Sequence, residues 1–340
     1  MPNPHADARR VASATRRSVR TIRVGGSTSR RQLDLVSIVH EGDADGPTVA
    51  LVANVHGDEV TGTGVVLAVD RWVSEHGLRG RLVLYPSANP EGLAARQRAV
   101  PEDGQDLNRL FPGSARGSWA PRLAHALWND LVAHTPDSVV DLHADAPHAI
   151  PYVICDRPAR LPSVRRTRLS AQILAMAEAT GFTILREYQD DIYLQYGLDR
   201  SLAGAVVNLL GKPAVTIESG PRRRLDPQAV ACALHGTLGA LGSLGLVDVD
   251  PVIHATRRVG AWRRSGAPRA KFGGLVETFV QPGELVKAGQ RLASLTSLTG
   301  RHLGTIAAHS DGVLVALNES GWLASGASVA TLGVPDGGPL

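Results

Sequence analysis

The stretch TVALVANVHGDEVTG, residues 48–62, decides the fold. Its first part, 48–53, is a continuous apolar run, which is typical of a strand covered on both faces in a parallel sheet. Apolar side chains then recur at helical spacing over 60–75. The stretch therefore predicts a strand–turn–helix unit, and it places two polar residues, His56 and Glu59, in the turn.

The same alternation of strands and helices continues along the chain. Further strands are predicted at QLDLVSIVHE (32–41), RLVLYPSANP (81–90), DSVVDLHAD (137–145), YVIC (152–155), FTILRE (182–187) and PAVTIES (213–219). Further helices are predicted at 122–135, 163–180, 202–211 and 226–244. Strands joined by helices predict an α/β fold over 33–248, with a mostly parallel mixed sheet and helices on both faces.

From 249 to 340 the pattern changes to short strand-like runs separated by turns, with little room for a helix. The sequence VQPGELVKAGQRLASL, 280–295, resembles the barrel-sandwich domains that carry biotinyl or lipoyl groups. Those carriers need a lysine at a hairpin tip, and RHLGTIAAHS, 301–310, contains none. We therefore expect a small all-β C-terminal domain of barrel-sandwich type, with a structural or site-covering role.

Composition and charge exclude several classes of protein. The 340-residue chain has no apolar run long enough to span a bilayer and no secretory signal pattern, so we expect a cytoplasmic protein that binds no membrane. The net charge is +4, but eight arginines and a single acidic residue lie within 1–31. We interpret 1–32 as a basic, flexible tail that binds no nucleic acid, because no aromatic residues are interleaved for base stacking.

Three side chains have the types and positions of a metal site. His56 and Glu59 lie three residues apart at the start of a helix, so their side chains share one side of it. His143 follows near the end of strand 137–145, and the carboxyl ends of parallel strands gather at one edge of an α/β sheet. Two imidazoles and one carboxylate are a ligand set of catalytic zinc that leaves one position open for water. Asp141, on the same face as His143, is placed to hydrogen-bond a ligating imidazole.

Two further segments carry polar side chains toward the same edge. In the loop GQDLNRLFPG, Asn108 is followed by Arg109, and Arg98 lies upstream. Arginine binds carboxylates through paired N–H groups, and asparagine adds a neutral donor. Glu218 lies at the carboxyl end of the last predicted strand, where a carboxylate can act as a general base.

Four motifs occur together in the order HGDE (56–59), DLNRLFPG (106–113), DLHAD (141–145) and TIESG (216–220). Over roughly residues 35–335 the chain thereby resembles the succinylglutamate desuccinylase/aspartoacylase family, zinc-dependent deacylases with the fold of the zinc carboxypeptidases. The resemblance implies one Zn²⁺ per chain, held by His56, Glu59 and His143. It also implies that Glu218 is the general base.

The resemblance assigns roles to the remaining polar residues. Arg98, with Arg96 as its rival, would stabilise the developing oxyanion, and Asn108 with Arg109 would bind a substrate carboxylate. The implied reaction is hydrolysis of the amide bond of a small N-acyl amino acid carrying a carboxylate. N-acetyl-diaminobutyrate, N-succinylglutamate and N-acetylaspartate are all compatible with it.

Two alternatives stay open at this point. A metallocarboxypeptidase acting on short peptides would share the metal, the base and the carboxylate clamp. A non-catalytic protein would bind a metal or an acidic ligand in the α/β domain and recruit a partner through the β-rich domain. The sequence also leaves a homo-oligomer open.

Overall fold

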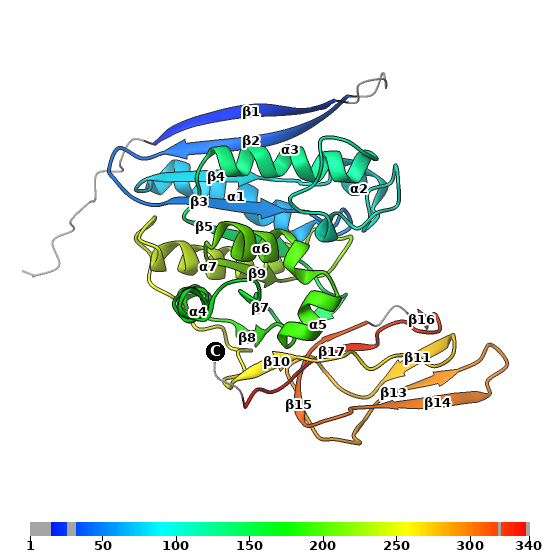
Figure 1. The fold of residues 1–340 in the computed structure, drawn as a ribbon. Coiled ribbons are helices and arrows are strands. Elements are labelled where there is room, and N and C mark those ends of the chain that lie inside the picture. Colours follow the sequence, from blue (N-terminus) through cyan, green and yellow to red (C-terminus); the bar gives the residue numbers. More distant parts are fainter. Residues whose placement is uncertain (1–14, 26–31, 319–320, 338–340) are drawn as a thin grey trace, which may run out of the picture.

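The computed structural model describes residues 15–25, 32–318 and 321–337, and one large sheet runs through it (Figure 1). Its strands are, in spatial order, β1 (Arg16–Gly25), β2 (Gln32–Glu41), β4 (Arg81–Tyr85), β3 (Thr48–Ala53), β5 (Ser138–His143), β9 (Ala214–Glu218), β7 (Tyr152–Cys155), β8 (Thr183–Arg186), β10 (Trp262–Arg264), β17 (Ala330–Pro335), β15 (Gly312–Leu317) and β12 (Leu285–Val286). In the described part of the chain, no helix is long and apolar enough to cross a membrane.

The centre of the large sheet is parallel. Strands β4, β3, β5 and β9 are neighbours that run in one direction. Strand β2 is antiparallel to both of its neighbours, β1 and β4, whereas β7 is antiparallel to β9 and parallel to β8. Most of these strands are buried along their length, as continuous apolar runs require. The predicted mixed, mostly parallel sheet is therefore confirmed.

Helices cover both faces of this sheet. One face carries α1 (Thr61–His76), α4 (Ser163–Ala179) and α7 (Pro227–Ser243), and the other carries α3 (Trp119–Ala133) and α6 (Leu202–Ala205) (Figure 1). Residues Val206–Leu210 continue α6 as a wider helical turn. The short helices α2 (Pro90–Ala95) and α5 (Asp190–Gln195) were not predicted, because six residues are too few to display a helical period.

The prediction of a flexible tail over 1–32 is wrong for Arg16–Gly25. This segment is β1, and it pairs antiparallel with β2 along its whole length. Its arginines form ion pairs with acidic groups of the body, namely Arg16 with Glu41, Arg17 with Asp70 and Arg20 with Asp130. The basic run is therefore an edge strand that pairs with β2 through its backbone and carries ion pairs to other elements. Residues 1–14 and 26–31 of the predicted tail lie outside the described residues.

After α7, the described residues form only strands and loops. Strands β10, β17, β15 and β12 extend the large sheet, and β6 (His148–Ala149) pairs with β15. A second sheet contains β14 (His302–Ala307), β13 (Arg291–Thr296), β11 (Gly274–Thr278) and β16 (Trp322–Leu323). The C-terminal part is all-β as expected, and its strands continue the sheet of the α/β part because β10 pairs with β8. The division at 248/249 stays a prediction.

Candidate metal centre and substrate cleft

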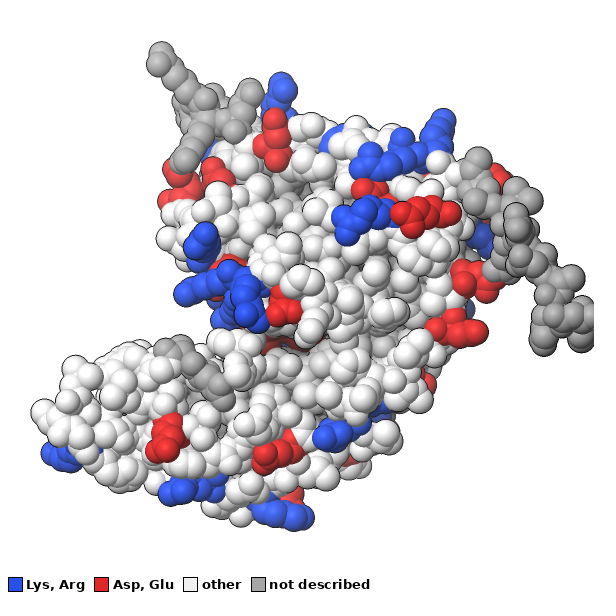
Figure 2. Space-filling view, turned by 180° about the vertical axis from the view of Figure 1, so that it is seen from behind, with Lys and Arg blue, Asp and Glu red and all other residues white. Residues whose placement is uncertain are grey.

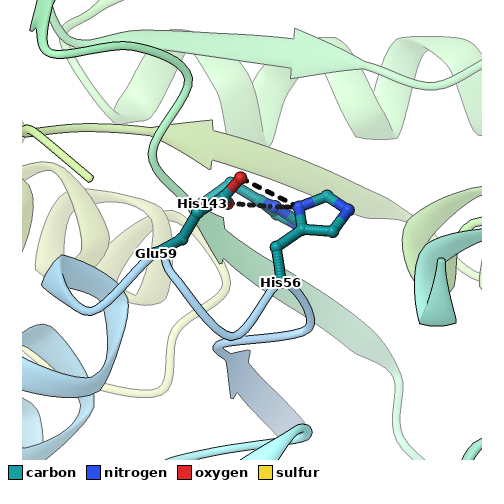
Figure 3. Close-up of side chains that lie close together, drawn as sticks. All are labelled: His56, Glu59 and His143. Carbon is teal, nitrogen blue, oxygen red and sulfur yellow. Dashed lines mark hydrogen bonds and ion pairs between the residues drawn. The ribbon is translucent and has the colours of Figure 1, made fainter. Parts of the chain in front are cut away.

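His56, Glu59 and His143 converge on one point (Figure 3). Nδ1 of His56 lies 2.9 Å from Glu59 Oε1, and Nδ1 of His143 lies 2.8 Å from Glu59 Oε2. The two Nδ1 atoms are 3.1 Å apart. All three residues are buried, and one possible ligand atom of each lies within 4.8 Å of the others. This donor set fits a metal ion that keeps one position open.

The turn after β3 fixes two of these residues. Asn54 has a left-handed φ of 59°, and its side-chain amide donates to the carbonyls of His56 at 2.9 Å and Gly57 at 3.0 Å. A Cβ at Gly57 would lie 2.1 Å from the carbonyl carbon of Gly92, so only glycine fits there. Asn54, which the sequence analysis did not single out, therefore holds the turn that carries His56 and Glu59.

A carboxylate faces the far ring nitrogen of each histidine. His143 Nε2 lies 2.9 Å from Asp141 Oδ2, so the expected proximity is present, although the two atoms are not aligned for the predicted hydrogen bond. His56 Nε2 lies 3.2 Å from Asp106 Oδ1, a contact that sequence spacing gave no reason to expect. Burial alone would lower the pKa of His143, but the charges of Asp141 and Glu59 hold it well above its usual value. Both rings are thereby oriented with Nδ1 toward the shared point.

Glu218 lies beside His143, because β5 and β9 pair these two residues in register. Its Oε2 is buried and has no hydrogen-bond partner among the described residues. Burial raises the pKa of Glu218 to about 8; His143 opposes the shift, whereas Glu59 and Asp145 add to it. A carboxyl group with such a pKa exchanges protons near neutral pH, which suits a general base.

The structure separates the two candidate arginines. Arg98 Nη1 donates to Glu59 Oε1 at 3.3 Å, and its Nη2 donates to Asp106 Oδ2 at 3.3 Å. Arg96 is exposed, ends α2 with a left-handed φ of 54° and does not line the cleft. Arg98 is thus the one of the two that lies at the metal end of the cleft, and its role stays a proposal.

Asn108 and Arg109 lie together in the wall of the cleft. Asn108 Oδ1 accepts a hydrogen bond from the backbone N–H of Leu202 at 2.8 Å, which anchors the loop to α6. Arg109 Nη1 donates to the carbonyl of Asn108 at 2.7 Å. Within the described ranges, no carboxylate forms an ion pair with Arg109, although Asp106 and Glu187 raise its pKa against the effect of burial, which lowers it. This guanidinium is therefore available to a ligand carboxylate.

One cavity of about 520 Å³ is lined by the three residues of the candidate metal site and by Arg98, Asn108, Arg109 and Glu218. Figure 2 shows the hollow between the larger body and the C-terminal lobe, with a group of Lys or Arg side chains at its upper edge. The C-terminal part contributes Arg264, Ser265, Gly266, Ala267, Arg269, Ser328 and Thr331. A hydrogen bond joins the C-terminal part to the α/β part at the cleft: Thr331 Oγ1 donates to Asp145 Oδ2 at 2.6 Å. The expected site-covering role of this part therefore has a structural basis.

Several charged groups of the cavity were not predicted from the sequence. Arg222 follows β9, lies 3.7 Å from Glu59 and donates through Nε to the carbonyl of Ala144 at 3.0 Å. Asp156 and Glu187 directly follow strands β7 and β8. The rule that polar residues at strand ends gather around a site could have found the last two, but it gives no indication of Arg222, which lies in a loop.

The sequence matches the succinylglutamate desuccinylase/aspartoacylase catalytic domain over residues 45–243. The chain belongs to this family. A relative from Halomonas elongata, N-alpha-acetyl-L-2,4-diaminobutyric acid deacetylase, is 26% identical over 292 residues, which are 83% of this chain and 80% of that protein. The predicted family is therefore confirmed.

Solved structures show the same fold. The product-bound ectoine utilization protein EutE (DoeB) of Ruegeria pomeroyi has a TM-score of 0.79 at 22% identity, over 95% of this chain and 96% of that one. A metallo-carboxypeptidase of Burkholderia cenocepacia has a TM-score of 0.51 at 19% identity, over 66% of this chain and 63% of that one. This chain thus has the carboxypeptidase-like fold that its resemblance to the family implied.

Proposed function

We propose that the protein is a zinc-dependent hydrolase that cleaves the amide bond of a small N-acyl amino acid carrying a carboxylate. The observation that carries this proposal is the convergence of His56, Glu59 and His143 beside the unpartnered carboxylate of Glu218. A purely structural zinc site would be closed by a fourth protein ligand. Among the described residues, the cluster has only three.

The donor set supports zinc as the metal. His56 and His143 would bind through Nδ1 and Glu59 through its carboxylate, because Asp106 and Asp141 face the two Nε2 atoms. Bound zinc would supply a water of lowered pKa and a Lewis acid for the substrate carbonyl. We infer one ion per chain.

The chain's own residues then perform the proton transfers and the orientation. Glu218 takes the proton of the attacking water and passes it to the leaving nitrogen, which departs as an amine. Arg98 donates hydrogen bonds to the oxygen that becomes negative, an effect worth roughly 3–4 kcal/mol per donor. Asn108 and Arg109 bind the substrate carboxylate and so hold the amide in place. The products are a carboxylic acid and a free amino acid.

The relatives support this class of substrate. The Halomonas elongata relative is by name a deacetylase of N-alpha-acetyl-L-2,4-diaminobutyric acid, and the family name contains two further deacylases. N-acetyl-diaminobutyrate, N-succinylglutamate and N-acetylaspartate therefore form the first panel to assay.

The test is turnover of this panel by zinc-loaded protein, with release of the free amino acid as the readout. We expect hydrolysis of at least one compound, and none after the metal is removed. Absence of turnover across the panel with verified zinc loading would contradict the proposed function.

A further inference from the structure

Asp156 is a buried carboxylate in the wall of the cleft that the proposed hydrolysis does not use. Its side chain follows β7, is 7% exposed and lines the cavity. Tyr193 donates its hydroxyl hydrogen to Asp156 Oδ1 at 2.8 Å. Among the described residues, no Lys, Arg or His nitrogen forms an ion pair with Asp156, and Oδ2 has no hydrogen-bond donor. A buried carboxyl group without a cation tends to keep its proton, whereas a cationic ligand beside it would stabilise the ionised form.

The surroundings of Asp156 add negative charge. Glu187, 4% exposed, follows the neighbouring strand β8 and raises the pKa of Asp156, which burial as the main cause brings to about 8. The nearby Arg264 is already engaged, because its Nη1 lies 2.7 Å from Glu187 Oε1. Its guanidinium also lies over the ring of Tyr188, 5.5 Å from the centroid. A cation from outside the chain is therefore what this end of the cavity lacks.

Asp156 and Glu218 lie at two ends of one surface. Strands β7 and β9 pair antiparallel with Ile154 opposite Thr216, and both of these residues line the cavity. Asp156 lies two positions after Ile154, and Glu218 lies two positions after Thr216. Side chains two positions apart in a strand share a face of the sheet. A substrate with its amide at Glu218 can therefore extend its side chain past Thr216 toward Asp156.

We propose that Asp156 binds a positively charged end of the substrate's side chain, so that the substrate is an N-acyl diamino acid. This inference rests on the proposed hydrolysis and names the substrate class within it. Arg109 and Asn108 would hold the carboxylate, and Asp156 would hold the ammonium group. The cleft would then discriminate by charge between this class and the acylated acidic amino acids.

The test compares N-acetyl derivatives of three amino acids of similar length, 2,4-diaminobutyrate, homoserine and aspartate. They end in an ammonium, a hydroxyl and a carboxylate. We expect kcat/KM of the zinc-loaded wild type to be roughly 30- to 1,000-fold higher for the ammonium compound than for the hydroxyl compound. Asp156→Asn should remove most of this ratio and change kcat/KM for the hydroxyl compound by less than about fivefold. Acetylated ornithine and lysine, assayed in parallel, report the preferred length.

Asp191→Asn is the matched control, because Asp191 is an exposed carboxylate on α5 outside the cavity. It should leave the ratio unchanged. Equal or better hydrolysis of the hydroxyl or carboxylate compound by the wild type overturns the inference and leaves the proposed function intact, whereas no hydrolysis of any compound overturns both. The wild-type ratio needs no variant, so the inference is decided even if Asp156→Asn does not fold.

Discussion

Glu218 ends β9 beside His143, and its buried Oε2 has no partner among the described residues. Replacing it with glutamine keeps the shape and removes the base. We expect Glu218→Gln to lower kcat by roughly 10²- to 10⁴-fold, the usual contribution of a general base. Zinc content should stay at the wild-type value, since Glu218 is outside the ligand cluster. A variant with near-normal kcat and full zinc would contradict the role of Glu218.

Arg98 and Arg96 form a natural pair of test and control. Arg98 contacts Glu59 and Asp106, whereas Arg96 is exposed at the end of α2. We expect Arg98→Gln to lower kcat by roughly 10²- to 10³-fold, as removal of an oxyanion donor does, and Arg96→Gln to have little effect. Steady-state kinetics with a zinc measurement on each variant check this. The reverse order of effects would transfer the role to Arg96.

Asp156 also affects stability in a pH-dependent way. Burial raises its folded pKa from 3.8 to about 8, so the folded protein keeps a proton that the unfolded chain releases near pH 4. The wild type therefore loses stability, relative to a variant without this carboxyl group, as pH rises from about 4 to about 8. We expect Asp156→Asn to increase the melting temperature little at pH 5 and more at pH 8.5. If the increase in melting temperature became smaller as pH rises, ionisation of Asp156 would not destabilise the folded protein.

At the scale of elements, the long, apolar strands and helices were predictable and the edges of the fold were not. Strands β3, β5 and β9, which lead to His56, His143 and Glu218, are predictable because each is a mostly apolar, buried run. Strand β1 has no such signal, because most of its side chains are exposed and four of its ten residues are arginine. Its arginines form ion pairs with acidic residues of other elements, and a single sequence does not show which of these charges meet.

The contact between β1 and α1 gives a test of this electrostatic attachment. Arg17 donates to Asp70 at 2.8 and 3.0 Å, and the buried His40 lies 2.7 Å from Asp70. Burial would raise the pKa of Asp70, but these hydrogen bonds keep it below 3.8. The ionised carboxylate therefore stabilises the fold above about pH 4, and this stabilisation is lost as pH falls through the lowered pKa.

We expect Asp70→Asn to reduce the free energy of unfolding by roughly 1–3 kcal/mol at neutral pH. The difference from wild type should be constant from about pH 5 to pH 7 and shrink below about pH 4. Urea unfolding across this range measures it. A difference that grows on acidification would contradict the assignment.

For the whole molecule, the sequence predicted that His56, Glu59, His143 and Glu218 lie close together, because they lie at or near strand ends, and the structure brings them together. It did not predict which segments complete the wall of the cleft. Asp106 and Arg222 lie in loops, and Arg264 comes from β10 of the C-terminal part, which pairs with β8. Such contacts join segments that are far apart in the chain, so no characteristic residue spacing in the sequence predicts them. They set the size and charge of the cleft, and so its choice of substrate.

The wall that the C-terminal part adds to the cleft predicts small substrates. Residues from 264–269 together with Ser328 and Thr331 line the cavity, and Thr331 is hydrogen-bonded to Asp145. We expect N-acyl amino acids to be hydrolysed and tripeptides to show turnover at least about 100-fold lower, because the wall blocks a longer chain. Release of C-terminal residues from a tripeptide panel at comparable rates would favour the carboxypeptidase alternative.

The most direct test titrates zinc into metal-free protein while turnover of an N-acyl amino acid is followed. We predict that activity rises linearly to a plateau at one equivalent per chain, and that Glu218→Gln binds the same equivalent without turnover. Full activity in protein verified to contain no metal, or a plateau that requires a second equivalent, would contradict a single catalytic ion held by His56, Glu59 and His143.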